Sequence, residues 1–364
     1  MNKNLFILAL CQIFSFTAAP VTVFLSGIIG SQISPVKSLA TLPMSISVVG
    51  IAIGAIIATK VMSLIGRKYG FILASTGNLL VSILAAYSIM YQNFILFCFA
   101  NFFIGIGMAF THQYRFAAAE SVEKNMAPKA ISIILFGGII SAFLGPSLAN
   151  YTKDLVSETL YVGSYLTLAL LTFIPAILFL FYESKSKIET NLEYAGRSYI
   201  ELILQPRFIQ AIAASAFGYA IMTFLMTATP ISMHVMENMS LNKTSIVIQF
   251  HVAAMFLPSL LTGHLIKKFG HSNIIYAGVF LYSITLIASI FEQSFFNYMF
   301  ALIFLGLGWN FLFISGTSLL VLTYKEEEKY KAQGMNDFVV YSIHAIGSLS
   351  AGIFCLYQAL VYSF

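Results

Sequence analysis

Charged residues are scarce in this chain. Only 9% of its 364 residues are Asp, Glu, Lys or Arg, whereas about a quarter of a soluble domain is usually charged. Hydrophobic residues make up 59% of the chain, and the mean hydropathy is +0.87. These numbers exclude a water-soluble globular protein and leave no room for a soluble catalytic domain beside the apolar runs. An integral membrane protein is expected.

Cysteine is equally rare. Cys11, Cys98 and Cys355 all lie in apolar stretches without Cys-x-x-Cys spacing. Neither a disulfide framework nor a metal site is expected, and nothing indicates a cofactor. The net charge of +5 is interpreted as basic residues in cytoplasmic loops rather than as affinity for nucleic acid.

Eleven apolar windows have the length of a membrane-spanning helix. They lie at 5–30, 38–59, 69–91, 94–114, 130–151, 160–182, 208–233, 244–266, 272–291, 296–323 and 334–358. The polar stretch 183–207 predicts a linker with an amphipathic helix on the membrane surface. We expect an all-α membrane fold with a first half at 1–182, this linker, and a second half at 208–364 that has no residues left for a twelfth span.

The basic residues predict the orientation. If the amino terminus is inside, all of the 19 Lys and Arg residues except Lys37, Lys153 and Lys243 fall in cytoplasmic segments. Cytoplasmic loops carry such an excess of basic residues in membrane proteins. We therefore expect a multi-pass protein of a bacterial inner membrane with a cytoplasmic amino terminus.

The two halves contain matching segments in the same order. They are Thr17-Ala18-Ala19-Pro20 with Thr227-Ala228-Thr229-Pro230, Gly66 with Gly270, Gly105-Ile106-Gly107 with Gly306-Leu307-Gly308, and Gly145 with Gly347. The separations are 210, 204, 201 and 202 residues. Four ordered matches at nearly constant spacing predict a duplicated six-helix unit.

These features resemble the major facilitator superfamily. Its signature between the second and third spans is Gly-x-Leu-x-Asp-Arg-x-Gly-Arg-Lys, and residues 59–68 keep the final Gly-Arg-Lys but carry Ser63 at the acidic position. A second copy, Gly263 to Gly270, keeps both glycines and has Lys267 at the acidic position. The resemblance covers essentially the whole chain. It implies two pseudo-symmetric six-helix halves that carry a small molecule by alternating access.

In the family, the acid and an arginine of this loop form an inside gate. Because Ser63 replaces the acid, Asp337 is expected to pair with Arg67. An equally weighted alternative is that the basic residues of these loops only fix the topology of the protein. The intramembrane histidines could titrate near neutral pH, although hydrogen-bonded packing is the commoner role. The candidate gate and coupling residues are Arg67, Lys68, Arg115, Glu120, Gly270, Asp337, His251 and His344.

A second group of polar residues is expected to line the substrate cavity. The paired Thr-Ala-x-Pro segments lie on spans 1 and 7, which line the cavity in the family. An equally weighted alternative is that the threonine hydroxyls are hydrogen-bonded to the backbone of their own helix. Asn101 replaces a family arginine and shares a helical face with Arg115. Snorkelling to the interface is the preferred interpretation of Arg115, and contact with the substrate is the alternative. The candidates are Thr17, Pro20, Asn101, His112, Tyr219, Thr227, Thr229, Pro230, Trp309 and Asn310.

Small residues indicate close helix packing. Gly105, Gly107, Gly145 and Pro146 are the candidates. The Gly145-Pro146 pair also looks like the motif of exchangers in the family, which weakly favours efflux.

The sequence therefore predicts a secondary transporter for a small neutral or anionic organic solute. We expect a monomeric carrier and not an enzyme. Coupling to protons or another ion stays open, because no Asp or Glu lies at mid-membrane. The alternatives are a multidrug-type efflux exchanger, an intramembrane enzyme and a channel. Zinc motifs, acidic pairs and a selectivity filter were not found in the sequence.

Overall fold

The computed structural model describes residues 2–36, 39, 42–156, 159–183, 196–233, 237, 239–290 and 294–361, and every regular element within these ranges is helical. Nine stretches of this part of the chain are long and apolar enough to cross a membrane. One of them, Leu42–Met90, has 49 residues and hence the length of two spans. The predicted all-α membrane fold is confirmed.

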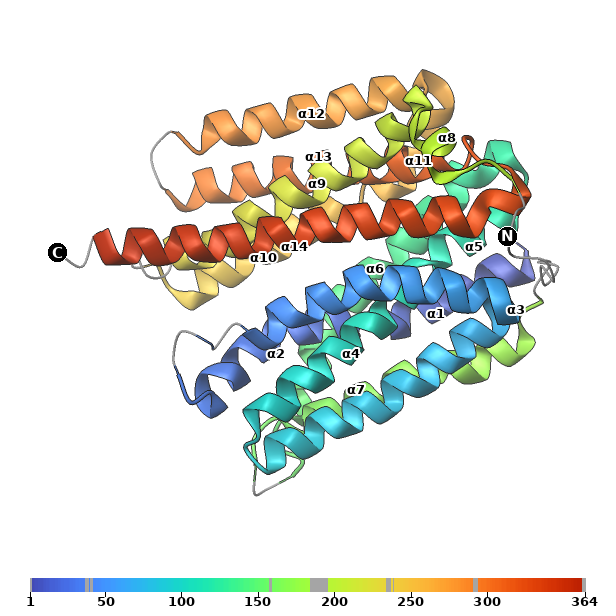
Figure 1. Ribbon diagram of the computed structural model, residues 1–364. Coiled ribbons are helices and arrows are strands. Elements are labelled where there is room, and N and C mark those ends of the chain that lie inside the picture. Colours follow the sequence, from blue (N-terminus) through green and yellow to red (C-terminus); the bar gives the residue numbers. More distant parts are fainter. Residues whose placement is uncertain are drawn as a thin grey trace. The chain divides into compact units, whose positions relative to one another are not determined.

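The helices overlap the eleven predicted spans, although α3 runs through two of them and the window at 5–30 contains both α1 and α2. The first half contains α1 (Lys3–Ser15), α2 (Ala18–Ile33), α3 (Leu42–Met90), α4 (Phe94–His112), α5 (Tyr114–Glu120), α6 (Ala127–Thr152) and α7 (Val162–Leu178). The second half contains α8 (Tyr199–Ile203), α9 (Pro206–Ile231), α10 (Leu241–Phe256), α11 (Ser259–Phe269), α12 (His271–Ala288), α13 (Phe295–Leu320) and α14 (Lys329–Val361). Figure 1 labels these elements along the chain. Residues 184–195 of the expected linker lie outside the described part, and the remainder holds the five-residue α8.

Local signals explain where several helices begin. The side chains of Asn2, Asn93, Ser240 and Ser294 each accept a hydrogen bond from the backbone amide three residues further on, which caps α1, α4, α10 and α13. Pro206 opens α9, where a missing backbone N–H costs nothing. Pro258 separates α10 from α11, so the single span expected at 244–266 consists of two helices.

The described chain forms two compact units. Unit 1 comprises Met1–Glu123, Gly137–Tyr199 and Lys325–Phe338, and unit 2 comprises Lys124–Phe136, Ile200–Tyr324 and Val339–Phe364. In unit 1, α3 packs along α4 and α7, and in unit 2, α13 packs against α9, α10 and α12 (Figure 1). The Lys325–Phe338 segment belongs to the second half of the sequence, yet it groups with unit 1. The division into functional halves at 1–182 and 208–364, which differs from these units, remains a prediction.

The repeated loop glycine has the same conformation in both halves. Gly66 interrupts α3 with φ 79° and ψ 163°, and Gly270 separates α11 from α12 with φ 83° and ψ 158°. Side chains other than glycine rarely adopt such positive φ values. The turn therefore explains why a glycine recurs at these two positions, 204 residues apart.

The paired glycines of α4 and α13 also meet equivalent neighbours. A methyl group at Gly105 would overlap the carbonyl oxygen of Ser47, and one at Gly306 would lie 2.6 Å from the carbonyl oxygen of His251. His251 follows Ser47 by 204 residues, the separation of the two loop glycines. A methyl group at Gly107 would meet the side chain of Asn78, and one at Gly308 would meet the side chain of Tyr282. The duplication thus extends from the sequence to the packing of the helices.

Candidate functional site

Arg67 lies at the centre of a buried polar cluster in unit 1. Its side chain is 1% exposed, and it donates from Nε to Glu120 Oε2 over 2.8 Å and from Nη2 to Glu120 Oε1 over 2.5 Å. Nη2 also donates to Gln333 Oε1 over 2.7 Å, and the guanidinium lies over the ring of Tyr330 at 5.2 Å. Gln333 Nε2 closes the cluster by donating to Glu120 Oε1 over 3.0 Å. A paired and fully hydrogen-bonded arginine of this kind can remain charged in a buried place.

Arg115 and Asp337 form a second buried ion pair. Arg115 Nη2 donates to Asp337 Oδ1, and both side chains are at most 2% exposed. Asp337 accepts further hydrogen bonds from Gln113 Nε2 over 2.7 Å and from Asn336 Nδ2 over 2.8 Å. The carboxylate therefore has one cationic partner and two amide donors, which together offset the loss of its hydration.

Glu328 provides a third attachment, outside the spans. It accepts from the backbone N–H and Nε of Arg197 over 2.8 Å each, and from Arg197 Nη2 over 2.5 Å. The backbone N–H of Lys325 donates over 2.9 Å to Glu328 Oε2, which also accepts from Arg197 Nη2. The hydrogen bonds from Arg197 lower the pKa of the Glu328 carboxyl to about 2. This carboxylate is hence ionised throughout the physiological range.

The three attachments lie along one segment. Glu328, Gln333 and Asp337 are all in Lys325–Phe338, and each binds a residue from an earlier part of unit 1. Gly334 adds close backbone packing, since a methyl group there would lie 2.5 Å from Thr59 Oγ1. The segment is held by charge and hydrogen bonds rather than by apolar contact alone.

The expected pair between Arg67 and Asp337 is wrong. Arg67 binds Glu120, which the sequence analysis placed among the coupling candidates, and Asp337 binds Arg115. Asp337 lies one helical turn beyond Gln333 on α14, so Gln333 rather than Asp337 reaches Arg67. The interpretation of Arg115 as snorkelling to the interface is also wrong, because its side chain is buried and paired.

Other gate candidates take up different positions. Lys68 Nζ is exposed and donates to the carbonyl oxygen of Leu180 over 2.7 Å, at the end of the helical turn that follows α7. His251 Nδ1 lies 2.8 Å from the carbonyl oxygen of Leu302, while its buried Nε2 has no partner among the described residues. Among the described residues, Lys68 and His251 therefore contact backbone carbonyl oxygens and not the side chains of the Arg67 cluster.

Unit 2 contains a cluster of aromatic side chains. Tyr219 meets Trp309 at 5.3 Å and His344 at 5.0 Å between ring centroids, and Trp309 stacks on Phe313 at 4.9 Å with an interplanar angle of 20°. Tyr341 lies 5.5 Å from Tyr219. These five residues, from α9, α13 and α14, are called the aromatic cluster below.

Two ring nitrogens of the aromatic cluster have no hydrogen-bond partner among the described residues. They are Trp309 Nε1 and His344 Nδ1, both buried. Buried polar groups are nearly always hydrogen-bonded, so unsatisfied ones call for an explanation such as an absent ligand. The cluster combines flat apolar surfaces with unused polar groups, a combination typical of small-molecule sites.

The remaining cavity candidates are occupied with helix packing. Thr17 Oγ1 donates to the carbonyl oxygen of Phe14, and Thr229 Oγ1 to that of Leu225, each within its own chain segment. Asn101 bonds Ser26 and the carbonyl oxygen of Phe97. These hydroxyls and amides are used inside the helix bundle.

Asn310 is likewise satisfied by neighbouring helices. Its Nδ2 donates to Met255 O and Ser259 Oγ, and its Oδ1 accepts from Thr262 Oγ1. His112 contacts the ring of Phe16 edge-on at 6.1 Å.

Gly145 packs against Pro20, since a methyl group at Gly145 would lie 3.1 Å from Pro20 Cγ. The side chains of Thr227, Pro230 and Pro146 lie outside the described residues.

Several contributing residues were not among the sequence candidates. They are Gln113, Arg197, Phe313, Glu328, Gln333 and Tyr341. The spacing of four residues between Gln333 and Asp337 and between Trp309 and Phe313 places each pair on one helical face, a signal that could have identified Gln333 and Phe313.

Comparison with known proteins gives consistent matches along the chain. The family model for the Major Facilitator Superfamily matches residues 5–348. The chain is 34% identical over 353 residues to "Riboflavin transporter RfnT" of Brucella anthropi, covering 96% of this chain and 88% of that protein. It is 25% identical over 374 residues to "Uncharacterized MFS-type transporter YddS" of Bacillus subtilis, covering 97% and 84%.

Two solved structures share the fold at low sequence identity. The human organic anion transporter MFSD10 (TETRAN) superimposes with a TM-score of 0.74 at 12% identity, covering 97% of this chain and 94% of that one. FucP in the outward conformation superimposes with a TM-score of 0.70 at 14% identity, covering 97% and 98%.

Proposed function

Because the chain belongs to the Major Facilitator Superfamily, we propose that it carries riboflavin, or a solute with the same flat fused ring system, across the membrane by alternating access. The observation that carries the substrate is the 34% identity to a riboflavin transporter over 96% of the chain. Riboflavin is uncharged at neutral pH, which agrees with the neutral or anionic solute that the sequence analysis expects.

The aromatic cluster is the proposed binding site for the ring system. Flat rings stack on aromatic side chains with centroids 4.5–7 Å apart, and Trp309 and Phe313 offer such faces. Trp309 Nε1 can donate to a ring carbonyl of the flavin, and His344 supplies a second polar atom. Because the five side chains contact one another here, a bound ring needs Tyr219 or His344 to turn aside.

The Lys325–Phe338 segment is the proposed gate. In alternating access one half of the protein moves against the other, so contacts between residues of the two sequence halves have to form and break. Gln333 and Asp337 make such contacts with Arg67 and Arg115. Glu328 adds a contact with Arg197 of the linker between the halves. With the amino terminus in the cytoplasm, as the basic residues predict, this gate closes the cytoplasmic side.

Binding can be measured through a single chromophore. Trp309 is the only tryptophan of the chain, and riboflavin absorbs in the range where tryptophan emits. Riboflavin added to the purified protein is expected to quench this fluorescence saturably. Lumichrome, which has only the ring system, should compete, and ribitol, which has only the sugar alcohol, should not.

Transport is tested by counterflow of labelled riboflavin into preloaded proteoliposomes that also contain a pH-sensitive dye. Saturable counterflow supports the proposal, and a change in internal pH that scales with uptake would identify proton coupling. Folded protein that shows neither quenching nor counterflow with riboflavin, but exchanges an unrelated organic anion or lipophilic drug, would overturn the substrate assignment.

A further inference from the structure

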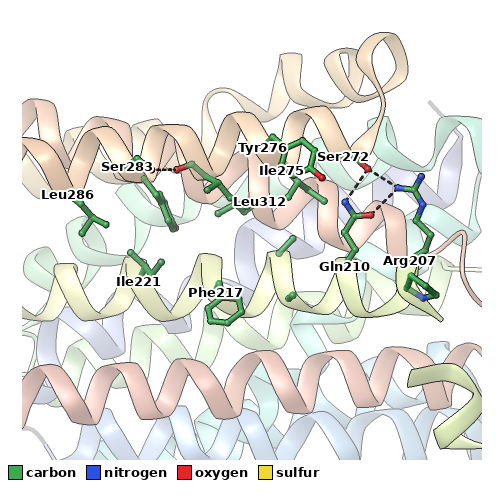
Figure 2. Close-up of a pocket in the computed structure, with 15 residues that line it drawn as sticks. Arg207, Gln210, Phe217, Ile221, Ser272, Ile275, Tyr276, Ser283, Leu286 and Leu312 are labelled. Atoms are coloured by element: carbon green, nitrogen blue, oxygen red, sulfur yellow. Dashed lines mark hydrogen bonds between the residues drawn. The ribbon is translucent and has the colours of Figure 1, made fainter. Parts of the chain in front are cut away.

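A groove runs along the outer side of unit 2, away from the aromatic cluster. It lies between α9 and α12, with Leu312 of α13 at its base, and has a volume of about 780 Å³ (Figure 2). Most of its length is apolar, with Phe217, Ile221 and Leu286 among the lining residues. Phe217 is 61% exposed, although it belongs to a spanning helix. Such a surface faces the lipid chains of the bilayer.

One end of the groove is polar. Arg207 Nη1 donates to Gln210 Oε1 over 2.9 Å and to Ser272 Oγ over 2.7 Å, and Gln210 Nε2 donates to Ser272 Oγ over 3.1 Å (Figure 2). Both hydrogen bonds of the guanidinium use Nη1 within the described residues, which leaves Nε and Nη2 for a ligand. Arg207 is the one cation among the fifteen lining residues, and none of these residues is acidic.

The start of α12 adds further donors beside Arg207. Ser272 is the second residue of this 18-residue helix, whose N-cap is Gly270 and whose first turn has no side-chain cap. Free amides at a helix N-terminus attract anions, especially phosphate groups. Together these groups form a place for a phosphate at the polar end of an apolar groove.

The dimensions match one leaflet of a bilayer. The lining residues of α9 extend from Pro206 to Ile221, which corresponds to about 22 Å along a helix. A single leaflet contributes roughly 15 Å of hydrocarbon, and the head-group region lies beyond it. A phosphate at Arg207 therefore leaves room for an acyl chain to follow the groove to the middle of the membrane.

We propose that this groove binds an anionic phospholipid, with its phosphate on Arg207 and Ser272 and one acyl chain along Phe217 and Ile221. Charge complementarity selects the lipid, because an arginine with no acid in the lining favours a head group with net negative charge. The apolar length of the groove selects a chain-bearing ligand over a soluble phosphate.

The proposal is tested by native mass spectrometry of the purified full chain. The protein is first delipidated and then titrated with phosphatidylglycerol or with phosphatidylcholine. Phosphatidylglycerol is expected to bind more tightly than phosphatidylcholine. Arg207→Gln should weaken phosphatidylglycerol binding about tenfold, since a charge-assisted hydrogen bond is lost. Ala213→Phe, which fills the groove from α9, should weaken binding of both lipids. Lys60→Gln is the matched control, because it removes an exposed charge from α3 in unit 1 and should change nothing.

Equal binding of phosphatidylglycerol by the wild-type protein and Arg207→Gln would overturn the proposal, as would equal affinity for the two lipids. Unchanged lipid binding by Ala213→Phe would contradict the placement of the acyl chain in the groove. Displacement of phosphatidylglycerol by glycerol 3-phosphate at equal concentration would identify the site as one for a free phosphate. No riboflavin is present in these measurements. Their outcome is therefore independent of the proposed transport function.

Discussion

The two halves share a backbone repeat but bury different chemistry. Unit 1 contains two arginines paired with acids beside its own ring contacts among Phe71, Tyr114 and Phe179. Unit 2 contains the aromatic cluster, in which Trp309 Nε1 and His344 Nδ1 have no partner among the described residues. At the 201-residue separation of the glycine pairs, Arg115 corresponds to Gly316, and Trp309 corresponds to Met108. The arginine of the second ion pair and the tryptophan of the aromatic cluster are therefore not repeated at the equivalent position of the other half.

This difference separates two tasks. Buried ion pairs are stable only with their specific partners in place, so they suit a gate that is either closed or open. An aromatic side chain can stack on a flat ligand at about the same separation as on another aromatic side chain. Such side chains therefore suit a site that binds and releases a ring. The predictions below break the two kinds of contact in turn.

The largest effect is expected from breaking the Arg115–Asp337 pair. Asp337→Asn leaves a buried arginine without its counterion, and breaking such a pair costs about 3–5 kcal/mol. A large fall in apparent melting temperature and loss of riboflavin counterflow are expected. The double variant Arg115→Gln with Asp337→Asn contains no unpaired charge and should recover most of the melting temperature. If the double variant is as unstable as the sum of the two single variants, the two side chains are not coupled.

The next largest effect is expected at Arg67. Arg67→Ala removes the hydrogen bonds to Glu120 and Gln333, and loss of charge-assisted bonds should slow counterflow by about tenfold or more. The neighbouring Lys68 is an internal control, because its exposed ammonium binds a single carbonyl oxygen. Lys68→Ala should retain counterflow within about twofold. Equal rates in both variants would contradict the role of the Arg67 cluster as a gate.

A smaller effect, confined to affinity, is expected in the aromatic cluster. Trp309→Phe keeps a stacking face but removes the N–H group, so the KM for riboflavin should rise roughly threefold to tenfold with little change in maximal rate. Tyr165→Phe is the matched control, since it removes a buried hydroxyl in unit 1. Counterflow kinetics of the two variants separate the units. A higher KM in Tyr165→Phe than in Trp309→Phe would place the ring site in unit 1 instead.

The spans could be predicted from the sequence because their signals are local. Hydrophobic length and the break at Gly66 depend on neighbouring residues only, and the glycine pairs reveal the repeat without any structure. The acidic partner of Arg67 could not be predicted in the same way. Glu120 is 53 residues from Arg67, and which acid an arginine reaches depends on how the helices are rotated.

The anchor between Arg197 and Glu328 was missed for a related reason. The two residues are 131 positions apart, and both lie in polar connections where an exposed charge is the ordinary expectation. In the aromatic cluster, Tyr219 and Trp309 were candidates, and Phe313 lies four residues after Trp309, but with 19 Tyr residues in the chain no pattern singles out Tyr341. Assembly of three helices, rather than any local motif, creates this site.

The smallest effect is expected from the contact between Arg197 and Glu328, and it depends on pH. Arg197 lowers the pKa of Glu328 to about 2 from an ordinary value of 4.5. A lowered pKa in the folded state contributes stability above the ordinary value, and this contribution is lost as the pH falls from about 4.5 toward 2. Glu328→Gln should therefore lower the melting temperature by the same few degrees at every pH from 8 down to about 5, and the difference from the wild-type protein should shrink below that. Melting curves of both proteins across this range would distinguish the anchor from a histidine-dependent contact, whose contribution would change between pH 5 and 8.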